Sequence, residues 1–109
     1  MRENEFRRWM FGLGTMQLRP IGDAVSRCRR VIKALQVSLD TEYRKDGCAS
    51  LLQKLEYTAE DERRGAPVVP GFDFSPRANL RKGMASLRTA VNKYVEFCEA
   101  EKSKMSPGS

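Results

Sequence analysis

Seven apolar residues between Pro20 and Gln36 recur at the spacing that places them on one face of an α-helix. They are Ile21, Ala24, Val25, Cys28, Val31, Ile32 and Leu35. Pro20 suits the first helical position, where its missing N–H costs nothing. Asp23 near the start and Lys33 near the end match the helix dipole. The pattern predicts a helix with an apolar inner face and arginine-rich outer faces, ending near Gln36.

A second pattern, of spacings 4, 3, 4, 3 and 4, predicts the longest helix over residues 76–101. Ser75 and Pro76 form an N-cap followed by proline at the first helical position. Ala90 and Phe97 widen the apolar stripe, which favours packing within the chain over a coiled-coil seam. A homodimer through the helix 80–98 stays open as an alternative. The stripe itself consists of Leu80, Met84, Leu87, Val91, Tyr94 and Cys98.

Shorter helices are expected before and between these two. Residues 3–11 form one, which Gly12 or Gly14 ends. The others are a helix capped by Ser38 and interrupted at Asp46-Gly47, an amphipathic helix over 48–56, and a polar turn through Arg64 opened by a capping box at Thr58–Asp61. We therefore predict an all-α fold, a compact bundle of four to five helices with a long C-terminal helix.

The stretch from Gly65 to Ser75 holds two prolines and a further glycine, so it is predicted to be a loop. Phe72 and Phe74 should pin this loop to the core, with a partner-facing aromatic pair as the alternative. The last residues are polar and include proline and glycine. We expect a single helical domain over 1–102 and a disordered tail over 103–109.

A chain of 109 residues with 40% hydrophobic and 31% charged residues has the composition of one soluble globular domain. No apolar run approaches the roughly 20 residues of a membrane span, so no membrane partner is expected. The start mixes charges and lacks the apolar core of a secretory signal. The three cysteines are widely spaced and suit buried thiols in a reducing compartment. These features favour a cytoplasmic protein.

Catalytic chemistry has little support in the residue types. The chain has no histidine and no C-x-x-C, so neither a common general base nor a zinc site is available. Gly12-Leu13-Gly14 follows a helix instead of a strand, which argues against nucleotide binding. The acidic run Glu60–Glu62 is followed by two arginines and resembles a solvated, self-paired turn. We expect no enzyme activity, no cofactor and no metal.

The net charge of +6 is unevenly distributed. Residues 1–36 and 66–109 carry net charges of +5 and +3, whereas residues 37–65 carry −2. Arginine's planar fork suits phosphate, so this asymmetry predicts an anionic partner. Ser26, Asn79 and Asn92 are candidate neutral donors, and Tyr57 is a candidate exposed aromatic. The candidate nucleic-acid-binding residues are Arg27, Arg29, Arg30, Lys33, Arg77, Arg81, Lys82, Arg88 and Lys93.

Three segments, Phe6–Met10, Ile21–Val31 and Ser86–Tyr94, resemble parts of helical DNA-associated modules. They are similar to the SAM-like core-binding domain of tyrosine recombinases and to small helical modules that accompany restriction and mobile-element proteins. The resemblance covers about half of the chain and implies DNA contact through helical faces. It does not imply recombination, because the recombinase catalytic tyrosine, histidines and arginines have no counterpart in this sequence.

Two functions follow as expectations. The first is a non-enzymatic accessory module that binds nucleic acid, duplex DNA above all, through a basic helical surface. The alternative is a protein-interaction module, either a homodimer or a phage or mobile-element protein that inhibits a host nucleic-acid enzyme. In that alternative the basic surface meets an acidic protein surface.

Overall fold

The computed structural model describes residues 1–72, 74 and 79–105, and these residues form six α-helices and no strand. Their bounds are α1 Glu3–Gly12, α2 Leu18–Leu35, α3 Leu39–Asp46, α4 Ala49–Lys54, α5 Ala59–Arg64 and α6 Leu80–Met105. Gly47 and Cys48 are the sole separation between α3 and α4. With α3 and α4 counted as one interrupted segment, the expected all-α bundle with a long C-terminal helix is confirmed.

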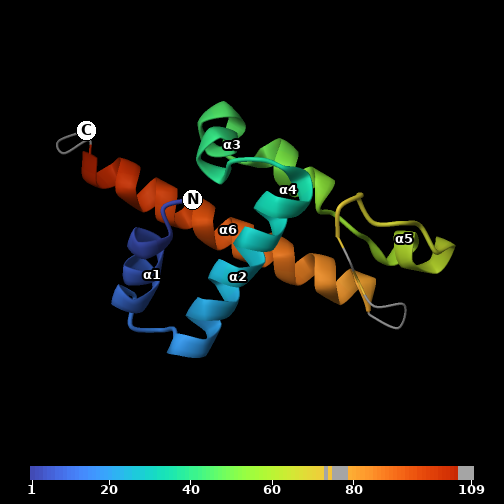
Figure 1. The fold of residues 1–109 in the computed structure, drawn as a ribbon, viewed down its shortest axis with the longest axis horizontal. Coiled ribbons are helices and arrows are strands. Elements are labelled where there is room, and N and C mark those ends of the chain that lie inside the picture. Colours follow the sequence, from blue (N-terminus) through green and yellow to red (C-terminus); the bar gives the residue numbers. More distant parts are fainter. Residues whose placement is uncertain (73, 75–78, 106–109) are drawn as a thin grey trace.

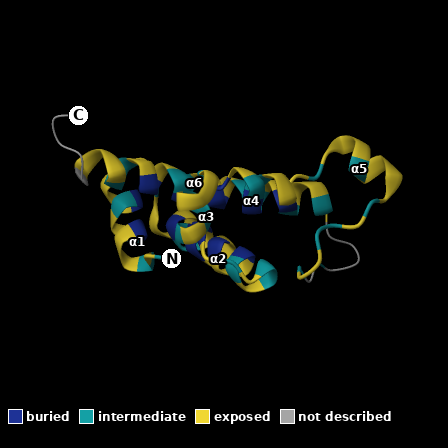
Figure 2. Cartoon of the chain, turned by 90° about the horizontal axis from the view of Figure 1, so that it is seen from above, coloured by how far each residue is buried: buried dark blue, intermediate teal, exposed yellow. Residues whose placement is uncertain are grey.

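α6 is the helix around which the others are arranged. It is the longest helix, it runs from beside α1 toward α5, and α2 crosses it near its middle (Figure 1). Each of the other five helices contacts α6, and α2 contacts it most extensively. The dark, buried positions in Figure 2 lie where α1, α2 and α4 meet α6, and α5 lies at one end with no buried residue. α2 and α6, the two long amphipathic helices that the sequence pattern predicts, therefore supply most of the core.

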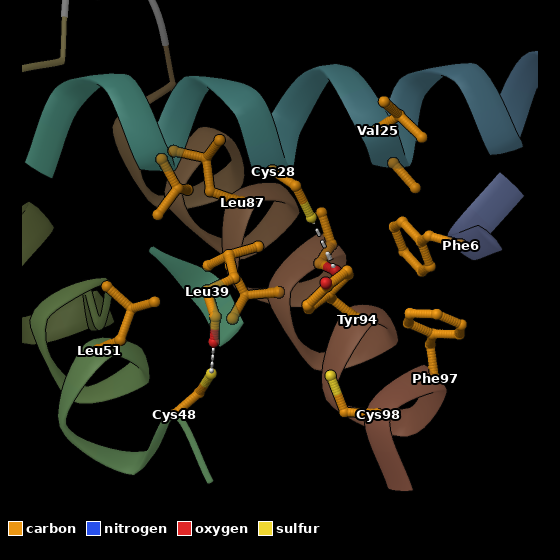
Figure 3. Packing of buried hydrophobic residues seen from close by; sticks show 14 of the residues in the cluster. Phe6, Val25, Cys28, Leu39, Cys48, Leu51, Leu87, Tyr94, Phe97 and Cys98 are labelled. Carbon is orange, nitrogen blue, oxygen red and sulfur yellow. Dashed lines mark hydrogen bonds between the residues drawn. The ribbon is translucent and has the colours of Figure 1, made fainter. Parts of the chain in front are cut away.

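The core includes a cluster of aromatic rings where α1 meets α6 (Figure 3). The Phe6 ring meets the Tyr94 ring edge-on at 5.0 Å between centroids, and the Phe97 ring lies 5.6 Å from Phe6. Tyr94 also donates a hydrogen bond to Asp40 Oδ1 at 2.7 Å and accepts one from the Arg2 backbone N–H at 3.0 Å. These bonds join the N-terminus and the start of α3 to the long helix.

The apolar stripe of α6 packs against other helices of the same chain, as its wide apolar face predicted. Met84, Leu87, Val91, Tyr94 and Cys98 are all buried by the chain's own helices. Across from them, the predicted inner face of α2 is buried at Ile21, Ala24, Val25, Cys28 and Val31, with Ile32 and Leu35 half-buried against it. A homodimer seam along residues 80–98 would have to displace these helices.

α2 begins two residues before the predicted start, so Pro20 is its third helical residue. The first N–H groups of a helix have no partner within it, so a proline in the first turn costs no internal hydrogen bond. The helix ends as predicted at Gln36, which caps it in the left-handed conformation with a φ of 53°. α1 likewise ends at Gly12, and Gly14 follows with a φ of 72°.

The predicted caps of the short helices are present. Ser38 Oγ accepts from the Thr41 backbone N–H at 3.4 Å. Thr58 and Asp61 form the reciprocal capping box of α5, with bonds of 3.1 and 2.9 Å. After α3, Gly47 and Cys48 both take left-handed backbone angles, and the turn places Cys48 in the core.

The start and end of α6 differ from the prediction. Asn79, which the prediction placed inside the helix, lies just before its first described residue, Leu80, because Asn79 Oδ1 accepts from the Lys82 N–H at 3.0 Å and caps the helix there. The predicted cap at Ser75-Pro76 lies outside the described residues. At the other end the helix continues to Met105, past the predicted end at 101, so the expected tail from 103 is helical for its first three residues.

The loop before α6 is fastened to α2, as predicted for its two phenylalanines. Phe72 and Phe74 are half-buried against the core, with ring centroids 6.1 Å apart. Gly71 has a φ of 110° and packs so closely on the carbonyl group of Ala34 that an added Cβ would lie 2.9 Å from the carbonyl carbon. This close approach requires glycine.

Candidate nucleic-acid interface

A polar stripe runs along α6 on the side next to α2. Lys82, Ser86, Thr89 and Lys93 are spaced i, i+4, i+7 and i+11, which returns them to one side of a helix. The two lysines are about 16 Å apart along the axis at 1.5 Å per residue. Ser86 and Thr89 donate their hydroxyl hydrogens to backbone carbonyls one turn earlier, so their oxygens remain as acceptors. The side chains that carry positive charge on this stripe are thus the two lysines.

Arg27 of α2 lies beside this stripe. A hollow of about 240 Å³ between the two helices is lined by Arg27, Thr89 and Lys93, together with Asp23 and several apolar atoms. Arg27 is exposed, and Lys93 is half-buried. The packing of α2 across α6 therefore brings together two cations that are 66 positions apart in the sequence.

Arg30 extends the same side toward the start of α6. Its guanidinium carbon lies 4.7 Å from the centre of the Phe74 ring, and that ring also packs on Gly83 of α6. Phe74 thus links Arg30 to the residue that follows Lys82. Arg27 and Lys93 share the hollow, Arg30 lies three residues after Arg27 on α2, and Lys82 lies on the same side of α6 as Lys93. We call these four cations the α2–α6 basic face.

Arg29 and Lys33 do not join this face. Arg29 pairs through Nη2 with Glu3 Oε1 of α1, so it is turned toward α1. Lys33 is one turn further along α2 on the same side as Arg29, and it is exposed. The basic side chains of α2 therefore point in two directions. Helical periodicity explains this division once the helices that pack against α2 are known.

Arg81 and Arg88 also lie elsewhere. They are seven residues apart and share one line of α6, but that line is rotated by about 100–140° from Lys82 and Lys93. Arg88 is half-buried, and its Nε atom has no hydrogen-bond partner within the described part of the chain. Arg77 lies outside the described residues. The eight candidates that the structure describes thus form separate groups, with four on one face.

Two of the four neutral candidates have structural roles. Asn79 caps α6, and Tyr57 is half-buried and donates its hydroxyl hydrogen to the Ala66 carbonyl at 2.6 Å. The prediction of Tyr57 as an exposed aromatic was wrong, because its ring packs partly against the core while its hydroxyl group bonds to the chain after α5. Ser26 and Asn92 are exposed.

Two carboxylates reduce the positive charge of the basic face. Lys93 Nζ pairs with Glu96 Oε2 at 3.1 Å on the same helix, and it also lies 6.0 Å from the centre of the Trp9 ring. Asp23, one turn before Arg27, lines the hollow itself. The sequence predicted Asp23 as a helix-dipole residue, and its place at this hollow depends on how α2 packs against α6.

The cysteines are poor candidates for chemistry. All three are buried and free. Burial raises the pKa of the Cys28 and Cys48 thiols to about 12, and it raises that of Cys98 as well. These groups therefore remain protonated near neutral pH, whereas a cysteine nucleophile acts as the thiolate.

Metal and membrane sites find no support in the described residues. In residues 1–72, 74 and 79–105, no three side chains of the metal-binding types cluster together. In the same ranges, no helix combines the length and apolar character needed to cross a membrane.

Comparison with known proteins assigns no family to this chain. No protein family, curated protein or solved structure matches it. Function is therefore inferred from the chain's own side chains.

Proposed function

We propose that this protein is a non-enzymatic module that binds nucleic acid, duplex DNA in the first place, through the α2–α6 basic face. The observation that carries the proposal is the meeting of Arg27 from α2 with Lys93 from α6 at one hollow. With Arg30 one turn along α2 and Lys82 on the same side of α6 as Lys93, the face offers four cations. The face is built from regular helices and needs no cofactor.

The length of the face suits a phosphate backbone. Lys82 and Lys93 are about 16 Å apart, which is close to five nucleotide steps at 3.4 Å per step along one strand. Arg27 and Arg30, on the crossing helix, offer planar guanidinium groups that can each donate two hydrogen bonds to a phosphate. Contacts of this kind fix position on the nucleic acid and carry affinity, whereas base contacts would carry sequence preference.

Removing one cation from each helix tests the proposal. Arg27→Ala with Lys82→Ala deletes two exposed groups for which the described residues show no ion pair. Binding to a short fluorescent duplex, and to one of its single strands, is titrated by anisotropy between about 50 and 200 mM salt. The wild-type affinity should fall steeply with salt. In the double variant the logarithmic slope should be shallower by about 2, since each phosphate that binds a cation contributes about 1 to it.

A matched control variant removes the same number of positive charges at positions away from the α2–α6 basic face. Lys45→Ala with Lys54→Ala removes two exposed lysines from α3 and α4 and should change the salt slope little. The proposal is wrong if neither duplex nor single strand binds at low salt. It is also wrong if the control variant lowers the slope as much as Arg27→Ala with Lys82→Ala.

Substitution of Asp23 should change nucleic-acid binding in the opposite direction. Because its carboxylate lines the hollow beside Arg27, Asp23→Asn should strengthen nucleic-acid binding a few-fold and make it more dependent on salt. Glu56→Gln, at an exposed position just after α4, makes the same charge change away from the face. Equal gains from both variants would indicate a response to net charge alone.

A further inference from the structure

The corner where α1 turns into α2 exposes two large apolar side chains. Phe11 is 64% exposed and Leu18 is 75% exposed, more than any other large hydrophobic residue that the structure describes. Together with Ile21, Arg7 and Arg8 they line a hollow of about 340 Å³, which we call the corner hollow. A single exposed leucine is ordinary on a protein surface, but apolar residues of two helices that meet in a hollow indicate a site of contact.

The two helices that form the corner hollow are firmly anchored. Phe6 and Met10 fasten α1 to the core with no exposed surface, and Ile21 fastens the first turns of α2. Phe11 and Leu18 project from the outer sides of these helices, so they cannot turn inward without displacing the anchors. The hollow is thus formed before any partner arrives, which lowers the conformational cost of binding.

The rim of the corner hollow is positively charged. Arg7 and Arg8 precede Phe11 by four and three residues, so they flank it on the helix surface. Glu3 serves both Arg7, at 3.4 Å, and Arg29, so one carboxylate is shared by two guanidinium groups. Among the described residues, the one hydrogen bond of the Arg8 side chain goes to the Asn4 carbonyl, at 3.5 Å.

We propose that the corner hollow binds an acidic amphipathic segment of another protein. One large apolar side chain of the segment fills the hollow between Phe11 and Leu18, and neighbouring carboxylates pair with Arg7 and Arg8. Charge complementarity selects such a segment over a second copy of this chain, since a twofold contact would place the same arginines against each other. The concave shape suits an inserted side chain better than a flat lipid surface.

This site is separate from the α2–α6 basic face. Leu18 and Arg27 are nine residues apart on α2, a rotation of about 180°, so they lie on opposite sides of that helix. A nucleic acid on one side and a protein segment on the other can therefore be bound together. Failure of one proposal leaves the other standing, because the variants that test them do not overlap.

The test uses a defined probe. A fluorescein-labelled peptide of about 15 residues, about four helical turns, carries leucine and phenylalanine on one face and glutamate elsewhere. Two partner peptides replace either every glutamate by lysine or every apolar residue by serine. Anisotropy titration of the full chain should show binding of the acidic amphipathic peptide, and at least tenfold weaker binding of the two others.

Variants then locate the binding site. Phe11→Ser with Leu18→Ser, and separately Arg8→Glu, should each weaken peptide binding at least tenfold while the circular-dichroism melt stays unchanged. Leu13→Ser is the matched control, because Leu13 is 40% exposed near the same turn but does not line the corner hollow. Arg27→Ala with Lys82→Ala should leave peptide binding intact.

Four outcomes would overturn the assignment. Two are equal binding of the acidic peptide and its lysine or serine version, and a loss of binding in Leu13→Ser as large as that in Phe11→Ser with Leu18→Ser. A third is binding of phosphatidylglycerol vesicles through Phe11 and Leu18 without binding of the peptide, which would indicate a membrane surface. The fourth is concentration-dependent self-association abolished by the same double change, which would indicate a second copy.

Discussion

The hydroxyl group of Tyr94 in α6 is hydrogen-bonded to both the N-terminus and α3. The substitution Tyr94→Phe removes this hydroxyl group and nothing else. The oxygen accepts the Arg2 backbone N–H at 3.0 Å and donates to Asp40 Oδ1 at 2.7 Å. Asp40 also pairs with the Met1 ammonium group at 3.5 Å and the Arg2 guanidinium at 3.5 Å. Phenylalanine keeps the ring that packs on Phe6 and deletes both hydrogen bonds.

The expected loss of stability is about 2 kcal/mol. A hydrogen bond to a charged group contributes about 1.5–3 kcal/mol, and an orphaned, partly buried N–H costs about 1 kcal/mol or more. The total is reduced because Asp40 keeps its two cationic partners. With an unfolding entropy of about 2.1 cal/mol/K per residue, a chain of 109 residues should lose about 9 °C in Tm.

Urea and thermal denaturation followed by circular dichroism measure this loss. Tyr94→Phe, Asp40→Asn and the double variant form a thermodynamic cycle, in which we expect a coupling energy of about 1 kcal/mol. Tyr94→Leu, which also removes the ring, should cost about 2 kcal/mol more than Tyr94→Phe. A loss below about 0.5 kcal/mol for Tyr94→Phe, or a zero coupling energy between Tyr94 and Asp40, would refute the view that the hydroxyl joins α3 and the N-terminus to α6.

Three further predictions concern the pH dependence of stability, the loop before α6 and the short helix α5. Burial raises the pKa of Cys28 and Cys48 to about 12, so the unfolded chain releases these protons first and stability should fall as pH rises from about 9 toward 12. Cys28→Ala should reduce that slope by up to about 1.4 kcal/mol per pH unit in alkaline urea titrations, and an unchanged slope would contradict the assignment. Gly71→Ala should lower the unfolding free energy by about 1–3 kcal/mol, since a Cβ at a φ of 110° meets the Ala34 carbonyl group; an unchanged urea midpoint would show that the loop adjusts freely. Thr58→Ala removes the cap of α5, which contributes no residue to the core, so amide exchange should accelerate in α5 while the global Tm stays nearly constant; a uniform acceleration would mean that α5 unfolds with the core.

The sequence was sufficient to predict which residues could contribute to the candidate interface, but not which of them share one surface. The sequence identified Arg27, Arg30, Lys82 and Lys93, because basic residues off an apolar stripe must face away from the core. It placed Arg29 and Arg88 in the same patch, since spacing along one helix carries no information about the neighbouring helix. Glu3, 26 positions before Arg29, turns that arginine toward α1, and no local pattern announces such a pair.

The corner hollow could not be predicted for a related reason. Phe11 and Leu18 lie at the end of one helix and the start of the next, where an apolar residue is as compatible with a turn as with a core. Whether each side chain is covered depends on the angle between α1 and α2. That angle is set by Phe6, Met10 and Ile21 packing into the core, and these contacts are long-range.

By itself the sequence determined the all-α class, the inner faces of α2 and α6, and the caps at Ser38 and Thr58. These features follow from periodicity and from side-chain bonds to backbone groups within four residues, so local chemistry is sufficient. The tertiary structure decided where α6 begins, which cations share a face and which apolar side chains stay exposed. Those properties depend on which helices meet and at what angle, and many distant side chains fix that geometry together.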